Sequence, residues 1–287
     1  GEVDLKTFEN GETYCRYIQS IRGADVFIVQ APSGTPNDYL MELLVMIDAA
    51  KLASAKRITA VLPWFPYSRQ DKKSAPREPI TAKLIAELLQ AAGVDRVLTM
   101  DLHAGQIQGF FSIPVDELTA LPLLSRYIVD KDLKKPVAVA VDIGGTKRAR
   151  NMAEQIGAPL AIVEKRRMGN EDKLETLNVI GDVNGRTAVM IDDEVATGGS
   201  LLSTVDALQE RGVTEVYACC THPILSGNAL QRLAESYLKE IVATNTVPLH
   251  EENLNGKVTV LSIAPLLGEA IQRIHNSLSV GSMFEER

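Results

Sequence analysis

The feature that most constrains the fold is the stretch of residues 188–200, AVMIDDEVATGGS. The apolar residues 188–191 predict a buried strand, and residues 201–211 have the periodicity of a helix. Asp192 and Asp193 follow the predicted strand at its carboxyl end, where open α/β sheets collect their ligands. We therefore expect an α/β fold with a binding site at this point.

The chemistry of this stretch suits a sugar phosphate. Gly198 and Gly199 allow backbone N–H groups to point at one anion, and the following helix adds its positive dipole end. Thr197 and Ser200 can donate hydroxyl hydrogen bonds, whereas the two aspartates suit ribose hydroxyls or Mg²⁺. A capped turn with solvated acids is the alternative. The usual Walker and dinucleotide-binding signatures do not occur in the sequence.

Strands and helices alternate along the whole chain, which is typical of parallel sheets with helices on both faces. The alternation restarts near residue 137, and no linker or low-complexity tract interrupts it. We predict two related α/β domains, 1–120 and 121–287, joined by residues 113–125, with the site in a cleft between them. The predicted strands are 26–30, 58–62, 97–100, 137–141, 160–163, 214–221, 240–244 and 258–261, and the clearest helices are 38–53, 81–92 and 265–276.

Other polar segments also follow predicted strands. His103 is placed where a side chain can bind a metal or a phosphate, although a lone histidine is more often structural. Residues 63–79 combine aromatic and cationic side chains, which could hold a base and phosphates or form an exposed charged loop. Residues 164–173 predict a mobile basic flap able to close over phosphates, with a solvated loop as the alternative.

Composition narrows the class of protein. A net charge of −7 argues against a general nucleic-acid surface. No apolar run reaches the roughly 18 residues that span a membrane, and the start of the chain is too polar for a signal peptide. Cys15, Cys219 and Cys220 lack zinc-ligand spacing and fit a reducing compartment. We therefore expect a cytoplasmic protein with no membrane or nucleic-acid partner.

Taken together, these segments resemble the ribose-phosphate pyrophosphokinase family, in its common phosphate-regulated class. The resemblance covers essentially the whole chain, in order, and several of the motifs are long. It implies a type I phosphoribosyltransferase-like fold for the two α/β domains. The segments that carry the resemblance are 8–13, 67–71, 101–111, 142–150, 165–167 and 192–200, with 37–43, 221–227 and 279–284 in support.

The resemblance implies transfer of the β,γ-diphosphoryl group of ATP to the 1-hydroxyl of ribose 5-phosphate, releasing AMP, for nucleotide biosynthesis. Mg²⁺ is the implied cofactor, and a homohexamer built from dimers is the implied assembly. The implied ribose 5-phosphate residues are Asp192, Asp193, Thr197, Gly198, Gly199 and Ser200. The implied ATP residues are Phe8, Asn10, Glu12, Arg69, Gln70, Asp71 and His103, and the implied metal residues are His103, Asp142 and Asp192.

Within the resemblance, Lys165 and Arg167 are the catalytic cations of the flap. They would close on the diphosphoryl group and neutralise the charge that develops during transfer. The hairpin of Phe8, Asn10 and Glu12 would reach into the site of a neighbouring subunit. No protein nucleophile is required, which agrees with the lack of a catalytic triad in the sequence.

The sequence departs from the family pattern at several positions. The family's initial strand and helix have no counterpart before Phe8, so we expect either that the sequence is trimmed at its start or that the first sheet lacks an edge element. Ala196 replaces an aspartate near the ribose, from which we expect a weaker grip on the substrate. Residues from Gly169 onward also differ from the usual flap.

Regulation by phosphate and ADP is implied by the resemblance, and Ser20 and Arg22 match part of that site. Ala75 stands where an arginine is common, and Gly281 replaces a serine. We expect phosphate activation and ADP inhibition to be weakened.

Two other functions remain open from the sequence. A phosphoribosyltransferase would share the acid pair and the phosphate loop, but it would leave residues 69–71 and 101–111 without a role. A noncatalytic associated subunit would keep the fold and regulate a partner enzyme.

Overall fold

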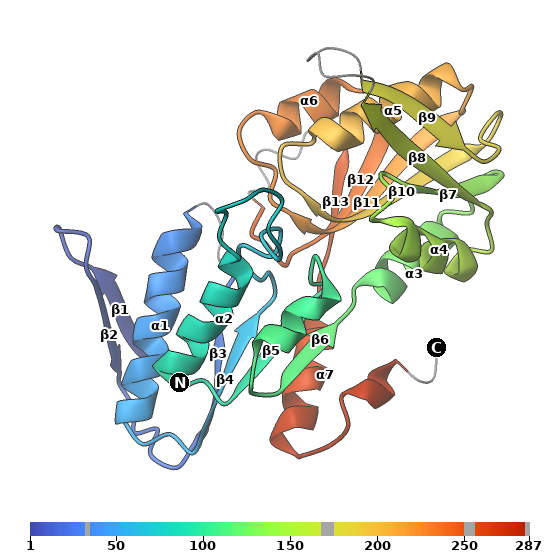
Figure 1. The fold of residues 1–287 in the computed structure, drawn as a ribbon. Helices are drawn as coiled ribbons and strands as arrows, with labels where there is room; N and C mark the ends of the chain where they lie inside the picture. The colour runs from blue at the N-terminus through green and yellow to red at the C-terminus, as the bar shows by residue number, and fades with distance from the viewer. Residues whose placement is uncertain (32–34, 168–174, 250–255, 285–287) are drawn as a thin grey trace. The chain divides into compact units, whose positions relative to one another are not determined.

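The computed structural model describes residues 1–287 except 32–34, 168–174, 250–255 and 285–287, and the side chains of 165–167, 175 and 176. The chain divides into two compact units (Figure 1). Unit 1 comprises residues 1–118 and 263–287, and unit 2 comprises residues 119–262. The expected domains, 1–120 and 121–287, therefore differ from these units mainly at the C-terminus, because residues 263–287 belong to unit 1.

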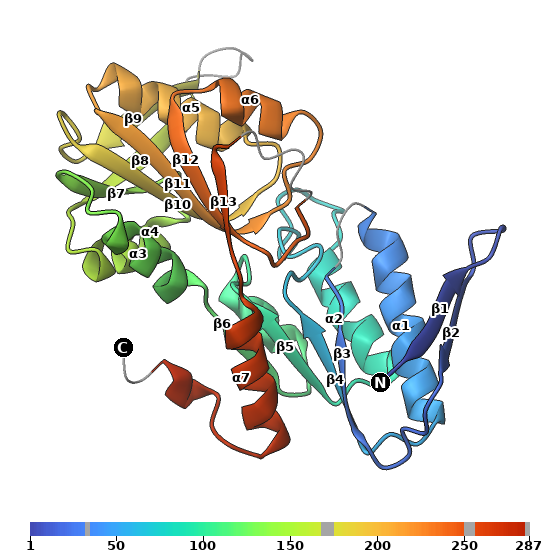
Figure 2. The same cartoon turned by 180° about the vertical axis from the view of Figure 1, so that it is seen from behind.

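Within the described residues, the sheet of unit 1 has four parallel strands in the order β3-β4-β5-β6. Helices α1 and α2 cover one face, and α7 covers the other (Figures 1 and 2). A separate antiparallel hairpin, β1-β2, packs on α1. The elements are β1 (Val3–Thr7), β2 (Thr13–Tyr17), β3 (Asp25–Val29), α1 (Pro36–Leu52), β4 (Arg57–Leu62), α2 (Thr81–Ala92), β5 (Arg96–Met100), η1 (Gly105–Phe110), β6 (Val115–Leu118), α7 (Ala264–His275) and η3 (Gly281–Met283).

Amphipathic helices hold the core of unit 1 together. Leu43 and Ile47 of α1 and Leu89 of α2 are fully buried against the sheet residues Ala60 and Val97. Each such aliphatic side chain contributes about 1.5–3 kcal/mol by leaving water. The helices therefore fix the carboxyl ends of β4 and β5, from which the polar loops of unit 1 extend.

Polar contacts attach α7 to the start of the sheet. Arg57 donates from Nε to Asp25 Oδ1 at 2.7 Å and from Nη2 to the carbonyl oxygen of Ile274 at 3.0 Å. His275 Nδ1 lies 2.8 Å from Asp25 Oδ2. The hydrogen bond from Arg57, together with that of His275, lowers the pKa of Asp25 in spite of its burial. The C-terminal helix is thus part of unit 1 by specific contacts.

In the described part of unit 2, the sheet has seven strands in the order β13-β12-β11-β10-β7-β8-β9. All neighbours are parallel except β8 and β9. Residues of α5 and α6 join one core cluster with alternate residues of β7, β10 and β11. The elements are α3 (Leu121–Asp130), β7 (Pro136–Ala140), α4 (Thr146–Gln155), β8 (Leu160–Arg167), β9 (Glu175–Ile180), β10 (Thr187–Val195), α5 (Gly199–Glu210), β11 (Glu215–Pro223), α6 (Ala229–Glu235), β12 (Leu238–Thr244) and β13 (Val258–Leu261).

The expected fold class, two mostly parallel α/β sheets flanked by helices, is confirmed. The chain passes from unit 1 to unit 2 within residues 113–125, which also contain strand β6 and the start of α3. Pro114 precedes the strand and Pro122 lies at the first turn of the helix, and both positions tolerate proline. Within the described residues, no helix is long and apolar enough to cross a membrane.

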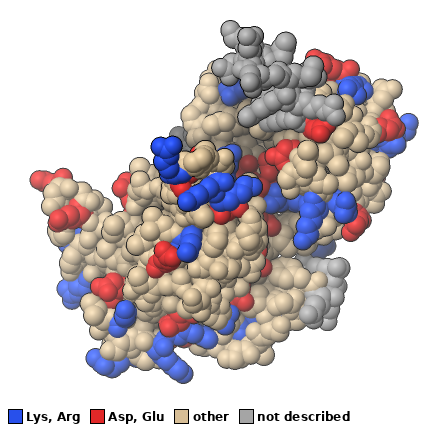
Figure 3. Space-filling view, in the orientation of Figure 1, with Lys and Arg blue, Asp and Glu red and all other residues tan. Residues whose placement is uncertain are grey.

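The cysteines divide between the units. Cys15 lies half-buried on β2, and Cys219 and Cys220 are buried on β11. On the face drawn in Figure 3, positive and negative side chains are interspersed.

Candidate active site

The predicted phosphate loop lies between β10 and α5 in unit 2. β10 ends at Val195, and α5 begins at Gly199 with Gly198 as its N-cap residue. Gly198 has φ +72°, a left-handed conformation that glycine adopts without strain. A Cβ at this position would lie 3.4 Å from the side chain of Leu233 on α6, an ordinary van der Waals contact, so the backbone conformation is what favours glycine here. The loop therefore presents the positive end of a twelve-residue helix, as expected for an anion seat.

A neighbouring segment supports this loop through its backbone. The N–H groups of Leu225 and Ser226 donate to the carbonyl oxygens of Val195 and Ala196 at 3.0 and 2.9 Å. Arg232 Nη1 lies 3.5 Å from the carbonyl oxygen of Thr197. Sequence analysis missed Arg232, because α6 begins 29 residues after Ser200 and carries no recognisable motif. The support explains how a loop of small residues keeps a fixed shape.

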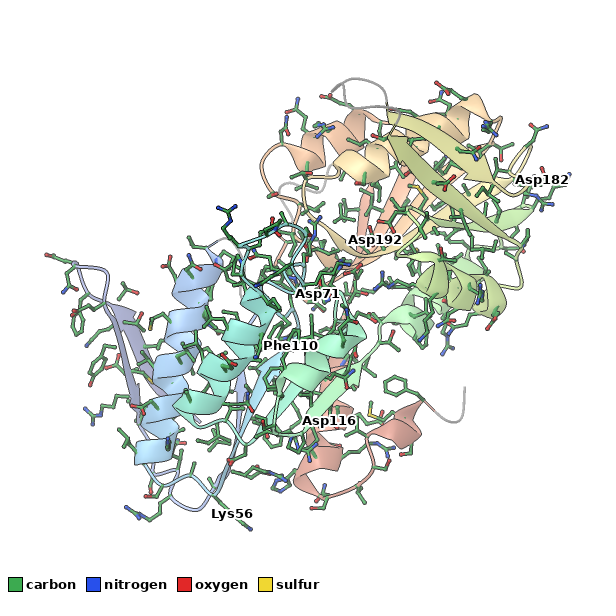
Figure 4. The ribbon with its side chains drawn as sticks, in the orientation of Figure 1. Lys56, Asp71, Phe110, Asp116, Asp182 and Asp192 are labelled. Atoms are coloured by element: carbon green, nitrogen blue, oxygen red, sulfur yellow. The ribbon has the colours of Figure 1, made fainter. Side chains whose placement is uncertain are left out.

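The acid pair lies at the end of β10 (Figure 4). The Asp193 side chain is only 5% exposed, and Arg148 Nη1 lies 2.8 Å from its Oδ1. The same guanidinium nitrogen lies 3.6 Å from Asp192 Oδ1, and the Asp192 side chain is 29% exposed. The backbone N–H of Asp193 donates to Asp192 Oδ1 at 2.9 Å. The two adjacent acids thus have different surroundings.

Electrostatics mark Asp192 as a site for a cation. Burial and then the charge of Asp193 raise the pKa of Asp192 well above its usual range, Asp142 raises it further, and Arg148 offsets this only in part. A hard divalent cation with oxygen ligands would relieve this repulsion. Asp142 is exposed and accepts the backbone N–H of Gly145 at 2.8 Å. The carboxylates therefore fit Mg²⁺, although no group of three metal-binding side chains gathers among the described residues.

The two flap cations lie on the same strand, β8, which pairs with β9 in antiparallel fashion. Lys165 and Arg167 belong to β8, where their backbone partners are Leu177 and Glu175 of β9. The strand predicted to end at residue 163 therefore continues to Arg167. The rest of the predicted flap, residues 168–174, lies outside the described residues.

The polar segments of unit 1 come together after β4 and β5, two neighbouring parallel strands. The buried Asp71 accepts a hydrogen bond from Gln106 Nε2 at 2.8 Å, which links residues 69–71 to the segment that contains His103. Gln70 Oε1 accepts the hydroxyl of Thr81 at 2.5 Å. Arg69 and His103 are exposed. Two motifs that were separate in the sequence therefore form one surface at the carboxyl edge of the sheet.

The hairpin residues lie elsewhere in unit 1. Phe8 is 47% exposed, and its ring contacts Tyr14 edge to face at 5.9 Å between centroids. Asn10 Oδ1 accepts the backbone N–H of Glu12 at 3.1 Å, which shapes the turn. In both views, α1 lies between this hairpin and the loop that carries Asp71 (Figures 1, 2 and 4). Within unit 1 the hairpin therefore does not join the other predicted ATP residues.

The predicted regulatory residues line a cavity of their own. Ser20 and Arg22 contribute to a hollow of about 450 Å³, with Arg16 and the end of α1. Gly281 lines a different hollow of about 440 Å³, next to Arg57 and Arg96. Within unit 1 these positions do not share one pocket.

Comparisons with known proteins agree with this arrangement. A model described as the N-terminal domain of ribose phosphate pyrophosphokinase matches residues 1–93, and one described as the phosphoribosyl synthetase-associated domain matches residues 170–285. The chain is 49% identical over 285 residues to a ribose-phosphate pyrophosphokinase of Halalkalibacterium halodurans, covering 99% of this chain and 90% of that protein. The corresponding protein of Bacillus cereus is 50% identical over 284 residues, with 99% and 89% coverage.

A solved structure also matches both units. The crystal structure of phosphoribosylpyrophosphate synthetase from Mycobacterium smegmatis is 44% identical and has a TM-score of 0.91. The match covers 96% of this chain and 91% of that one. With half of its residues identical to such relatives along nearly its entire length, the chain belongs to the ribose-phosphate pyrophosphokinase family.

Proposed function

We propose that the chain transfers the β,γ-diphosphoryl group of ATP to the 1-hydroxyl of ribose 5-phosphate, giving phosphoribosyl pyrophosphate and AMP for nucleotide biosynthesis. Family membership over the full chain is the observation that carries this proposal. The phosphate loop at the start of α5 and the acid pair on β10 support it, because they suit the two ends of a sugar phosphate.

In this proposal the sugar phosphate binds in unit 2. The helix start receives the 5-phosphate, with Thr197, Gly198, Gly199 and Ser200 as its seat. The carboxylate of Asp192, whose side chain is 29% exposed, accepts hydrogen bonds from the ribose hydroxyls. Such contacts hold the 1-hydroxyl in one orientation, which lowers the entropic cost of in-line transfer.

ATP is assigned to the polar surface of unit 1 and to the hairpin. The guanidinium of Arg69 suits the phosphates, and Asp71 and Gln70 are held in place by Gln106 and Thr81. His103 and Asp142 are assigned to the phosphates of Mg-ATP. Mg²⁺ would be held by Asp192 and Asp142 together with His103, and when bound it would neutralise charge on the transferring group.

The flap cations Lys165 and Arg167 are assigned to the diphosphoryl group. Donors aimed at developing charge are worth about 10²–10³-fold in rate each. Their position two residues apart on the same strand, β8, supports this role, because alternate residues of a strand share one face.

A homo-oligomer, built from dimers into a hexamer, is part of the proposal. The hairpin lies across α1 from the other ATP residues of unit 1, which favours a site completed by the hairpin of another copy. A symmetric assembly would give every site the same hairpin. The proposal also includes weakened regulation by phosphate and ADP. Ala75 and Gly281 support this, since they lack the cation and the hydroxyl expected there.

The test is AMP release from Mg-ATP with and without ribose 5-phosphate, for the wild-type chain and for a Lys165→Ala/Arg167→Ala double variant. We expect AMP that depends on ribose 5-phosphate, and a fall of at least about 10²-fold in the variant. AMP that appears only with a nucleobase would favour a phosphoribosyltransferase. No AMP, despite thermal protection by ribose 5-phosphate, would favour a noncatalytic subunit.

A further inference from the structure

We propose that Arg148 is a positioning residue that separates the tasks of the two adjacent acids. Arg148 holds Asp193 inside unit 2 and thereby leaves Asp192 alone as the acid that contacts the sugar phosphate. This inference rests on the proposed function and refines it, because the resemblance assigns both acids to the ribose.

The first observation is the different exposure of the two carboxylates. The Asp193 side chain is 5% exposed and the Asp192 side chain 29% exposed. Successive side chains on a strand point to opposite faces, so a single ligand cannot approach both acids in the same way. The ligand-facing acid is Asp192, and Asp193 faces the interior.

The second observation is the origin of the partner of Asp193. Arg148 lies in the first turn of α4, just after the segment that contains Asp142, and α4 packs on β7 and β10. Its Nη1 lies 2.8 Å from Asp193 Oδ1, and its side chain is only 21% exposed. A buried carboxylate without such a partner is strongly unfavourable, so this contact fixes the side chain of Asp193. The planar guanidinium also fixes direction, which a lysine ammonium does less well.

The third observation connects Asp193 to the ligand-facing acid. The backbone N–H of Asp193 donates to Asp192 Oδ1 at 2.9 Å, and Arg148 Nη1 lies 3.6 Å from the same oxygen. One oxygen of Asp192 is therefore oriented by the protein. Arg148 acts through these contacts and need not touch the substrate.

The consequence for binding can be measured. Outer partners of ligand-binding groups typically change affinity by about 10–100-fold when they are removed. We expect Arg148→Gln to weaken ribose 5-phosphate binding by this factor, since Asp193 would rearrange together with Asp192 when the ion pair with Arg148 is lost. Arg148→Lys should recover part of the loss, because it keeps the charge without the planar fork.

The experiment is calorimetric titration of the full chain with ribose 5-phosphate, alongside the AMP assay and a melting curve for each variant. Arg150→Gln is the matched control, because Arg150 lies on the same helix and is exposed. The decisive variant is Arg148→Gln/Asp193→Asn, which removes both charges of the pair. It should bind ribose 5-phosphate more tightly than Arg148→Gln alone, and the control should match wild type.

Two results would overturn the proposal. One is wild-type affinity in a folded Arg148→Gln variant. The other is a double variant that binds no better than Arg148→Gln, which would mean that Arg148 contacts the substrate directly. If Arg148→Gln does not fold, the proposal requires Arg148→Lys to bind more weakly than wild type, and equal affinity refutes it. The wild-type measurements test the proposed function separately. If the wild-type chain neither releases AMP in the presence of ribose 5-phosphate nor binds ribose 5-phosphate, both the proposed function and the role of Arg148 are refuted.

Discussion

The two units assemble their candidate binding residues in opposite ways. Unit 2 builds its phosphate seat from one continuous segment, in which β10, the loop and α5 follow each other directly. In unit 1 the candidate residues come from the hairpin and from the loops after β4 and β5. The other face of its sheet is covered by α7, which lies near the end of the chain. Asp25 and His275, which join α7 to β3, are 250 residues apart. A local site depends on backbone geometry, whereas a dispersed one depends on tertiary contacts.

The largest expected effect comes from breaking the local site at its glycine. Gly198→Val forces a branched residue into a left-handed conformation and against Leu233. A displaced seat should reduce ribose-dependent AMP release by about 10²-fold. The thermal shift caused by ribose 5-phosphate should disappear with it.

Gly11→Val is the matched change in unit 1. Gly11 has φ +89°, but nothing lies within 4 Å of a Cβ built there. Valine at position 11 would meet backbone strain comparable to that at position 198, but no neighbouring atom. The thermal shift caused by ribose 5-phosphate should therefore persist, whereas the KM for ATP should rise. Loss of the shift in this variant would show that the two regions are not independent.

A smaller effect is expected from recombining two defective chains. A hairpin variant, Phe8→Ala/Asn10→Ala/Glu12→Ala, and the Lys165→Ala/Arg167→Ala variant should each be weakly active. If the hairpin serves another subunit, coexpression of the two creates some sites with all parts intact, and AMP release should exceed the sum of the separate activities. Simple additivity would mean that each hairpin serves its own subunit.

The smallest expected effect comes from weakening the contacts that attach α7 to the sheet of unit 1. Asp25→Asn should lower the free energy of unfolding at neutral pH by about 1–3 kcal/mol, since it removes a charge-assisted contact with Arg57. The pKa of Asp25 is lowered in the folded state, so its stabilisation is complete above the usual aspartate range and is lost as the pH falls. The difference between wild type and variant should therefore shrink below about pH 4. Urea unfolding followed by fluorescence of Trp64, the single tryptophan, reports unit 1 directly.

The same contrast explains what the sequence could predict. Residues 188–200 and the main strands were predictable because apolar runs and glycines act locally. α5 begins and ends close to the expected residues, whereas β10 continues four residues beyond the expected end at 191 and includes both acids. The pairing of Asp193 with Arg148 and the contact of Arg232 with the loop were not, since each joins separate elements. The return of α7 to unit 1 depends on Asp25 and Arg57, and no local pattern marks such a contact.

The distribution of the cysteines leaves one thiol on the hairpin available for selective labelling. Cys15 on β2 is the one thiol that is not buried, and all three cysteines lie among the described residues. Burial, followed by the charges of Glu42 and Asp4, raises the pKa of Cys15, so alkylation should be slow at neutral pH and faster in mild alkali. A maleimide dye should therefore label the native chain once, on the hairpin, without mutagenesis. If the hairpin serves a neighbouring subunit as proposed, the emission of the dye would change when the chains associate.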